Sequence, residues 1–430
     1  MMGRKRGVSQ VVLSVALVMA AWPLAARGAG AAEEARVGLL LPFSGPWAKF
    51  GNEMAMAVEI ARDLVNQSGG APGGRTITLV KADIPNPTAA TSEASRLVAQ
   101  EKLQVLLGTF AAPLGVAVSA VAAKEAVVHW EIMAAADILT KRNSKWIFRN
   151  GLAAGRYGAG AVDMAAELIA PKLGAAARSL RVGTLWENRP WGTGTGEGVR
   201  ARAKELGLPL ALDESYDQFA TDMTPIVQKV KDATLDVLIA ASYYNDAVLF
   251  QKKARELNLY LKALVGLSAG YAIPEFGQVM GKAANGIFDV ETPPRVGREA
   301  LRPETARLAD FFYDAYRKKT GHEPAGHAVA SFAAAHLLFH DVLRAAKGMQ
   351  AEDIRAAAVM LDKPPGYQIN GWGVKYSQFD QPGDPKDAGQ NLRSFVVAWQ
   401  WQDGHPVTVW PKRFAQREPI LVPLSPWEKR

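Results

Sequence analysis

The feature that most constrains the fold is a repeated alternation of short apolar runs with longer segments of helical periodicity. In the first repeat, the apolar run ARVGLLLPFSG is followed by NEMAMAVEIARDLVNQSGG, whose apolar residues recur at helical spacing before a glycine-rich stop. Continuous apolar runs are typical of strands that are buried on both faces, and the intervening helices cover those faces. The sequence therefore predicts an α/β fold built on parallel sheets.

Two such series follow one another along the chain. The first includes the expected strands RTITLVKAD, LQVLLGTF and VVHWEIM, and the second runs from AGAVDMAAELIAPKL to the strand KALVGL. Two doubly wound series of similar length predict two lobes, and 430 residues exceed what a single core usually supports. Two further helices follow, and apolar and polar residues alternate on both sides of Asp403-Gly404, which predicts a terminal β-hairpin.

The first residues have the three parts of a secretory signal peptide. These are the basic GRKRG, the apolar VVLSVALVMAAWPLAA and the small-residue end RGAGAA. The apolar run has about 16 residues, short of the roughly 20 that a membrane-spanning helix needs. The chain contains no cysteine, which excludes disulfides, thiolate metal sites and a lipid-modified cysteine at the cleavage point. We expect residues 1–31 to be removed on export to the periplasm.

The charge distribution argues against nucleic acid as a partner. The net charge is +8, and four of the basic residues lie in the expected signal peptide. The remaining basic residues are scattered among acids, as in QKKARELN, which is typical of a solvated helix face. The excess that remains after cleavage is too weak to predict nucleic-acid binding.

The stretch GLSAG at residues 266–270 matches the Gly-x-Ser-x-Gly pattern of the nucleophile elbow in α/β-hydrolases. Such an elbow requires a helix that begins directly after the serine. Pro274 lies six residues past Ser268, where it would remove a donor and clash with the preceding turn. No glycine-rich oxyanion segment is evident upstream, and the downstream histidines have no marked acid partner. We therefore expect no enzymatic activity and keep a serine hydrolase that uses Ser268 as a distant alternative.

Two other patterns invite a cofactor or a metal. WGTGTGEG at residues 191–198 opens an expected helix, but its glycines do not give Gly-x-Gly-x-x-Gly, so no dinucleotide site is predicted. His336 and His340 are four residues apart on an expected helix and could chelate a metal, with His327 as a third ligand. Their neighbours in SFAAAHLLFHDVL are apolar. This favours ordinary packing, and we predict neither a cofactor nor a metal.

The segment RVGLLLPFSGPWAKFGNEMAMAVEIARDLVNQSGG resembles the start of the Leu/Ile/Val-binding type of periplasmic substrate-binding proteins, which serve ABC importers. The resemblance continues through GTFAAPLGVAVSAVA and WENRPWGTGTGEGV to the terminal NLRSFVVAWQWQDGHPVTVWP and covers essentially the whole mature chain. It implies two doubly wound α/β lobes that are joined by three crossings and close on a ligand by hinge rotation. The crossings would fall near Gly151, Thr292 and Pro365. The implied limits are 35–151 and 292–365 for lobe 1, 152–291 and 366–415 for lobe 2, and 416–430 for a C-terminal tail.

The same resemblance implies the ligand-facing residues, which are Phe50, Phe110, Ala111, Ala112, Ala134, Ala135, Trp191, Tyr243 and Ser268. In amino-acid binders of the family, the positions of Ala112 and Ala135 carry hydroxyl residues that hold the ligand carboxylate. The position of Ser268 carries a glutamate that pairs with the α-ammonium. This chain departs at all three positions. We therefore expect an apolar or aromatic ligand without a free α-ammonium, unless one of four other acids replaces the missing one: Glu131, Asp137, Glu187 or Asp246.

Together these features predict a soluble, monomeric periplasmic receptor of an ABC importer. Its expected partners are a small-molecule ligand and a membrane permease. The alternative in another class is a periplasmic ligand-sensing protein that acts on a membrane receptor or regulator.

Overall fold

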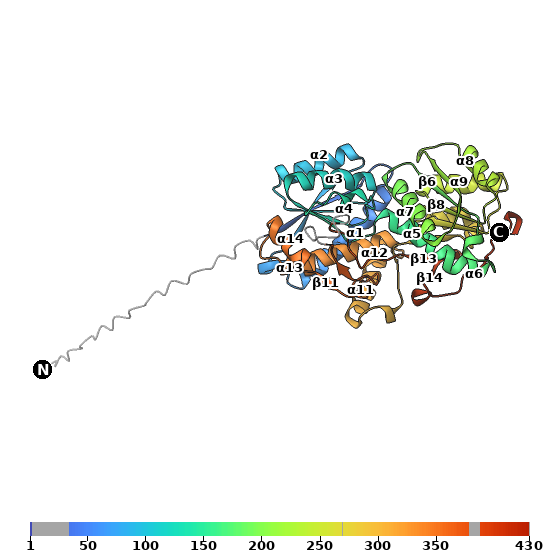
Figure 1. The fold of residues 1–430 in the computed structure, drawn as a ribbon. Coiled ribbons are helices and arrows are strands. Elements are labelled where there is room, and N and C mark those ends of the chain that lie inside the picture. The colour runs from blue at the N-terminus through green and yellow to red at the C-terminus, as the bar shows by residue number, and fades with distance from the viewer. Residues whose placement is uncertain (2–33, 269, 378–387, 430) are drawn as a thin grey trace.

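The computed structural model describes residues 1, 34–268, 270–377 and 388–429. The expected signal peptide lies outside the described residues except for Met1. The predicted fold class is confirmed, because the chain forms two α/β lobes that lie side by side, each around its own sheet (Figure 1). Across the described residues, we find no helix with the length and apolar character needed to cross a membrane.

The first lobe is built on a five-stranded parallel sheet in the order β2-β1-β3-β4-β5. Its strands other than the edge strand β2 are almost entirely buried, as their apolar runs predict. The strands are β1 (Ala35–Leu41), β2 (Ile77–Asp83), β3 (Val105–Leu107), β4 (Val128–Glu131) and β5 (Ile147–Arg149). The helices of this lobe are α1 (Ala48–Gln67), α2 (Pro87–Ala99), α3 (Ala112–Glu125), α4 (Ile138–Lys141), α11 (Pro303–Thr320), α12 (Gly326–His336), α13 (Leu343–Ala345) and α14 (Ala351–Val359).

The second lobe is built on a seven-stranded sheet in the order β14-β13-β10-β9-β8-β6-β7. The strands β6 to β10 are parallel, and β13 and β14 extend the sheet in antiparallel fashion. The strands are β6 (Val182–Glu187), β7 (Leu210–Tyr216), β8 (Val237–Ala241), β9 (Ala263–Leu267), β10 (Phe288–Glu291), β13 (Val397–Gln402) and β14 (His405–Trp410). The helices are α5 (Ala154–Met164), α6 (Ala170–Lys172), α7 (Pro190–Leu206), α8 (Thr224–Asp232), α9 (Tyr244–Glu256) and α10 (Pro274–Met280).

The predicted C-terminal hairpin is confirmed. Asp403 and Gly404 connect β13 to β14 with φ angles of 52° and 80°. Two positive φ angles in a two-residue turn match the right-handed twist of the paired strands. Beyond the hairpin, the chain packs back on the second lobe, where the indole of Trp427 donates to the carbonyl of Leu259 at 2.6 Å.

The third connection between the lobes contacts the end of β5 in the first lobe. After the small ribbon of β11 (Asp362–Lys363) and β12 (Val374–Lys375), the segment around Gln390 runs beside the end of β5. The buried guanidinium of Arg149 donates to the side chain of Gln390 at 2.6 Å. We propose on this basis that the third crossing follows Asn391 rather than lying near Pro365.

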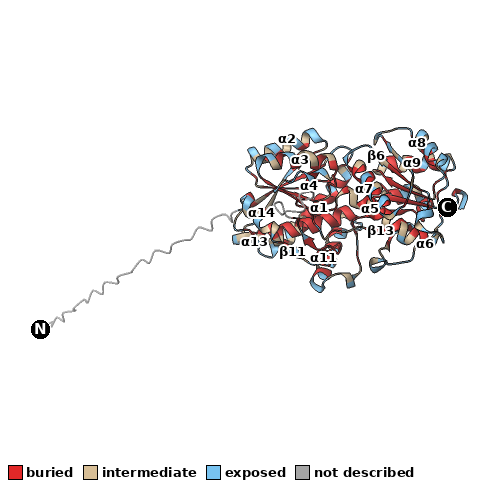
Figure 2. Cartoon of the chain, viewed as in Figure 1, coloured by how far each residue is buried: buried red, intermediate tan, exposed pale blue. Residues whose placement is uncertain are grey.

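Helices α5 and α7 approach each other closely because glycines line their contact. A Cβ on Gly158 would lie 2.2 Å from the carbonyl oxygen of Thr195, and one on Gly198 would lie 2.1 Å from that of Gly155. Both contacts are to backbone, which cannot move aside cheaply. Figure 2 shows buried residues along the strands and these inner helices, whereas α2 and α8 expose their outer faces.

We predict that Gly158→Ala destabilises the protein, because its methyl group must push α5 away from α7. Overpacking of this kind typically costs about 1–3 kcal/mol. Gly155→Ala is the matched control on the same helix, since its Cβ would lie 3.4 Å or more from every neighbour. Urea unfolding of both variants measures the effect. Equal stabilities of the two variants would contradict the role of Gly158.

Candidate functional site

Two adjoining cavities lie between the lobes, at the carboxyl ends of the strands. Their walls share Phe110, Met133 and Ser268. The first lobe contributes Phe50, Phe110, Ala112, Met133, Ala135, Ala325, Gly326 and His327. The second lobe contributes Tyr157, Trp191, Tyr243, Ser268, Ala272, Ile273 and Glu291. Open α/β sheets bind ligands at this edge, so the cavities are the candidate site.

The structure brings together most of the residues that the sequence predicts to face ligand. Those that line the cavities are Phe50, Phe110, Ala112, Ala135, Trp191, Tyr243 and Ser268. Ala111 and Ala134 are buried beside them and line neither cavity. The contact of each residue with a ligand stays a prediction.

Aromatic rings form much of the cavity surface. The rings of Phe50 and Phe110 are stacked, with centroids 4.4 Å apart and an interplanar angle of 13°. In the second lobe, the rings of Trp191 and Tyr243 lie 5.4 Å apart. Trp47 of α1 approaches Tyr243 from the opposite lobe at 6.3 Å. These flat apolar faces suit a hydrophobic or aromatic ligand body.

Glu291 brings a buried carboxyl group to this apolar surface. It is the last residue of β10 and is 4% exposed. Its Oε2 accepts a hydrogen bond from the hydroxyl of Ser268 at 2.7 Å, and its Oε1 accepts from the backbone N–H of Thr292. Burial raises the pKa of Glu291, and these hydrogen bonds oppose the rise only in part. A further hydrogen-bond donor would therefore stabilise the ionised form of Glu291.

The expectation that the cleft holds no acid for a ligand ammonium did not take Glu291 into account, which lines the cavity. Whether the ligand carries an ammonium stays a prediction. Because β10 lies next to β9, the side chain of Glu291 reaches the hydroxyl of Ser268. The sequence does contain a signal that could have identified Glu291. Glu291 immediately precedes the crossing expected at Thr292, and the carboxyl end of a parallel strand faces the cleft.

The four acids considered as replacements from sequence do not line the cavities. Three of them hold local backbone or side-chain groups. Glu131 accepts hydrogen bonds from the backbone N–H groups of Thr109, Met133 and Ala134. Glu187 accepts from the backbone N–H groups of Arg189 and Gly192. Asp246 accepts from the hydroxyl of Tyr216. Asp137 lies 3.8 Å from the amino group of Lys141. These carboxylates support the loops that surround the cleft rather than face its interior.

The geometry of Ser268 differs from that of a nucleophile elbow in two respects. Its φ of 51° is in the left-handed region, as strained turns require, but the next helix, α10, begins only at Pro274. Its hydroxyl donates to Glu291 rather than to an imidazole. The loop therefore lacks the helix start that would supply an oxyanion site directly after the serine.

The expectation that the downstream histidines lack an acid partner is wrong for His327. Its Nε2 lies 2.6 Å from Oε2 of Glu53, and its ring contacts Phe50 edge-on at 5.1 Å. Burial would raise the pKa of Glu53, but the hydrogen bond and charge of His327 outweigh it, so the pKa is lowered. This pair joins α1 to α12 and fixes one side of the cavity. His327 is therefore not part of a metal cluster with His336 and His340.

The comparisons with known proteins agree with this geometry. A family model described as periplasmic binding protein matches residues 34–363. The chain belongs to the periplasmic binding protein family. The curated relative Leu/Ile/Val-binding protein homolog 7 of Brucella suis biovar 1 is 32% identical over 410 residues, covering 95% of this chain and 98% of the relative. The resemblance inferred from sequence is confirmed.

Solved structures share the fold of this periplasmic binding protein at lower identity. The branched-chain amino acid transporter substrate-binding protein LivJ of Streptococcus pneumoniae, in complex with isoleucine, has a TM-score of 0.71 at 20% identity, over 87% of this chain and 98% of that chain. An ABC transporter solute-binding protein of R. palustris, in complex with benzoate, has a TM-score of 0.68 at 22% identity, over 87% and 95% of the two chains. These likenesses show the fold that the chains share.

We predict that Asp246 makes stability fall as the pH rises. Burial raises its pKa from the usual 3.8 to about 7, although the hydrogen bond from Tyr216 opposes the shift. The native state thus holds this proton more tightly than the unfolded chain. The resulting stabilisation is fully present below about pH 4 and is lost as the pH rises through about 7, at most about 4 kcal/mol.

Urea unfolding between pH 5 and 8 tests this prediction with Asp246→Asn, which removes the titration and keeps the size of the side chain. The wild-type protein should lose stability relative to the variant as the pH rises. Parallel pH profiles would show that Asp246 titrates near its ordinary value.

Proposed function

We propose that this protein is the solute-binding receptor of an ABC importer, that it works as a monomer in the periplasm, and that it captures a small apolar or aromatic organic molecule by hinge closure. The observation that carries the proposal is the aromatic cavity between the lobes, with the Ser268–Glu291 pair as its buried polar group. Family membership and the expected signal peptide support the location. The isoleucine and benzoate named for the two solved structures are ligands of this size and character.

Contacts across the mouth of the cleft support closure as the mechanism. Lys49 of α1 forms an ion pair with Glu275 of α10, and Trp47 of the first lobe faces Tyr243 of the second. These contacts join the two lobes and would separate if the lobes rotated apart. A ligand that touches both lobes adds further contacts that exist only in the closed state. It therefore shifts the balance toward closure by its difference in affinity for the two states.

The polar groups of the cavity suggest which ligand groups are recognised. Ala112 and Ala135 offer no side-chain donor, so a ligand carboxylate depends on backbone N–H groups at helix starts, such as that of α12 at Gly326. Glu291 accepts hydrogen bonds. A ligand that offers it no donor would leave the free-energy cost of burying its carboxylate uncompensated in the closed cavity. We therefore propose that the ligand combines an apolar body with a donor group, an ammonium or an amide, that reaches Glu291.

Calorimetry with phenylalanine, leucine, isoleucine and valine, each beside its deaminated analogue, tests the donor group. We expect the amine-bearing member of a binding pair to bind at least tenfold more tightly, which is about 1.4 kcal/mol. Glu291→Gln should remove most of this preference, because the neutral amide keeps the shape but not the charge. Glu304→Gln, an exposed acid on α11, is the control. Analogues that bind as tightly as the amino acids, in wild type and variant alike, would contradict the role of Glu291.

We also predict that Ser268 is not a catalytic nucleophile. A fluorophosphonate probe reacts with serines that a neighbouring base activates, whereas the hydroxyl of Ser268 donates to a carboxyl group and no helix start follows it. Intact mass spectrometry after incubation with the probe should show no adduct. Stoichiometric labelling that disappears in Ser268→Ala would overturn the binding-protein proposal.

A further inference from the structure

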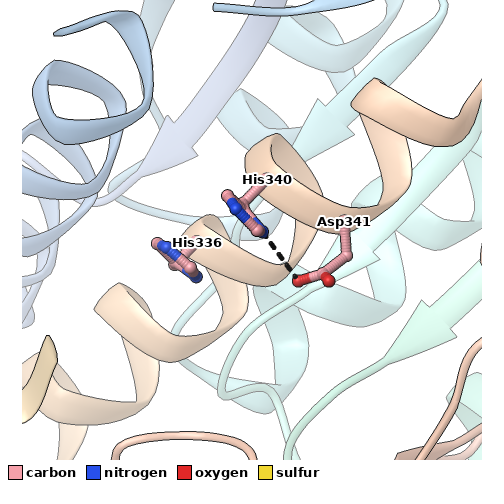
Figure 3. A group of neighbouring side chains, drawn as sticks. All are labelled: His336, His340 and Asp341. Carbon is pink, nitrogen blue, oxygen red and sulfur yellow. Dashed lines mark ion pairs between the residues drawn. The ribbon is translucent and has the colours of Figure 1, made fainter. Parts of the chain in front are cut away.

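A second group of side chains converges in the first lobe, away from the ligand cavities. His336 ends α12, and His340 and Asp341 lie in the π-helical segment η6 (Leu337–Val342) that continues it. One nitrogen of each imidazole and one oxygen of Asp341 lie within 4.8 Å of one another. Figure 3 shows the three side chains together along this helix, with His340 facing Asp341. The cavity beside them shares no wall residue with the ligand cavities.

The π-helical turn explains how three residues come to share one face. In an α-helix, His340 lies near His336 because it is four residues on, but the fifth residue points about 140° away around the axis. A π turn is wider and hydrogen-bonds residue i to residue i+5, which brings the fifth residue back over the first. Asp341 thereby joins the two imidazoles. Single π turns of this kind occur frequently at functional sites.

The spacing of one pair, His340 and Asp341, suits a shared ion better than a direct hydrogen bond, and the other two pairs lie within 4.8 Å. His340 Nδ1 and Asp341 Oδ2 are 3.6 Å apart, beyond the usual hydrogen-bond range. Both atoms are buried, and neither has a hydrogen-bond partner among the described residues. Two ligand atoms that each lie about 2.0–2.1 Å from one Zn²⁺ ion, at tetrahedral or slightly wider angles, are about 3.3–3.6 Å apart.

The surroundings hold the three side chains in place. Tyr367 donates a hydrogen bond from its hydroxyl to Oδ1 of Asp341, and Oδ2 is the oxygen that faces His340. The ring of His336 is stacked on Phe332 at 5.7 Å and on the ring of His340 at 4.9 Å, so one imidazole must rotate for both nitrogens to face one ion. Hydrogen-bonded partners that orient ligating side chains in this way are typical of metal sites. Arg344, on the same helical segment, donates to carbonyls of residues 65, 68 and 70 rather than to Asp341.

We infer that His336, His340 and Asp341 form a binding site for a divalent transition-metal ion, with Zn²⁺ as the best match. Two imidazole nitrogens and one carboxylate oxygen favour Zn²⁺, Ni²⁺ or Co²⁺ over Mg²⁺ or Ca²⁺, which prefer oxygen ligands throughout. Water completes the coordination, and the 42% exposed side chain of His340 provides the entry path. The site is independent of the proposed solute-binding function.

Metal titration of the mature chain, prepared without a polyhistidine tag and treated with chelator, tests the assignment. We expect calorimetry with zinc chloride to give one ion per chain at micromolar affinity. The double variant His336→Gln/His340→Gln should lose this binding, and Asp341→Asn should weaken it at least tenfold. His405→Gln, in the exposed hairpin turn, is the control and should bind as the wild type does. Equal binding by wild type and double variant would overturn the site.

A second measurement uses only the wild-type protein and so does not depend on the folding of a variant. Diethyl pyrocarbonate modifies accessible histidines, and mass spectrometry locates each adduct. Zn²⁺ should protect His340 and leave the modification of His405 unchanged. Modification of His340 at the same rate with and without Zn²⁺ would overturn the assignment.

Discussion

The parallel direction of the strands determines where the functional side chains of this protein meet. In each lobe the strands β1 to β5 or β6 to β10 run the same way, so every strand-to-helix loop begins at the same edge of its sheet. The two edges face each other across the cleft, and side chains far apart in sequence become neighbours there. Ser268 and Glu291 meet because β9 and β10 are adjacent in the sheet, although 22 residues of chain lie between them.

The buried carboxyl groups at this edge divide into two kinds. Glu131 and Glu187 each accept several backbone N–H groups of the loops that follow them, and so hold Met133 and Trp191 at the cavity. Glu291 has fewer such partners and lies beside Asp289 on the same face of β10. Burial and the charge of Glu291 raise the pKa of Asp289. Two carboxyl groups in one apolar region cannot both ionise at low cost, so a donor or cation beside Glu291 would lower the cost of its ionisation.

The sequence predicts the architecture of this protein well because apolar strand runs and turn signals are local. The parallel sheets, the hairpin at Asp403 and most of the cleft residues could be identified before the structure was known. Glu291 was missed because the family pattern directs attention to the position of Ser268, and only the pairing of β9 with β10 shows that the next strand supplies an acid. The sequence pointed to His336 and His340 as possible chelators but to His327 rather than Asp341 as their third partner. Nothing in the apolar pattern around His336 reveals the π turn that brings Asp341 to the same face.

The glycines of the segment WGTGTGEG do not have the spacing of a dinucleotide loop, and the structure shows a packing role for them. A Cβ on Gly192 would lie 1.9 Å from the carbonyl oxygen of Glu187, and one on Gly196 would lie 3.0 Å from the ring of Trp186. The glycines thus let the start of α7 pack directly against the end of β6. This packing, together with the hydrogen bond from Gly192 to Glu187, sets the position of Trp191 in the cavity. The close backbone packing thus determines the shape of the cavity, and the side chain of Trp191 forms part of its wall.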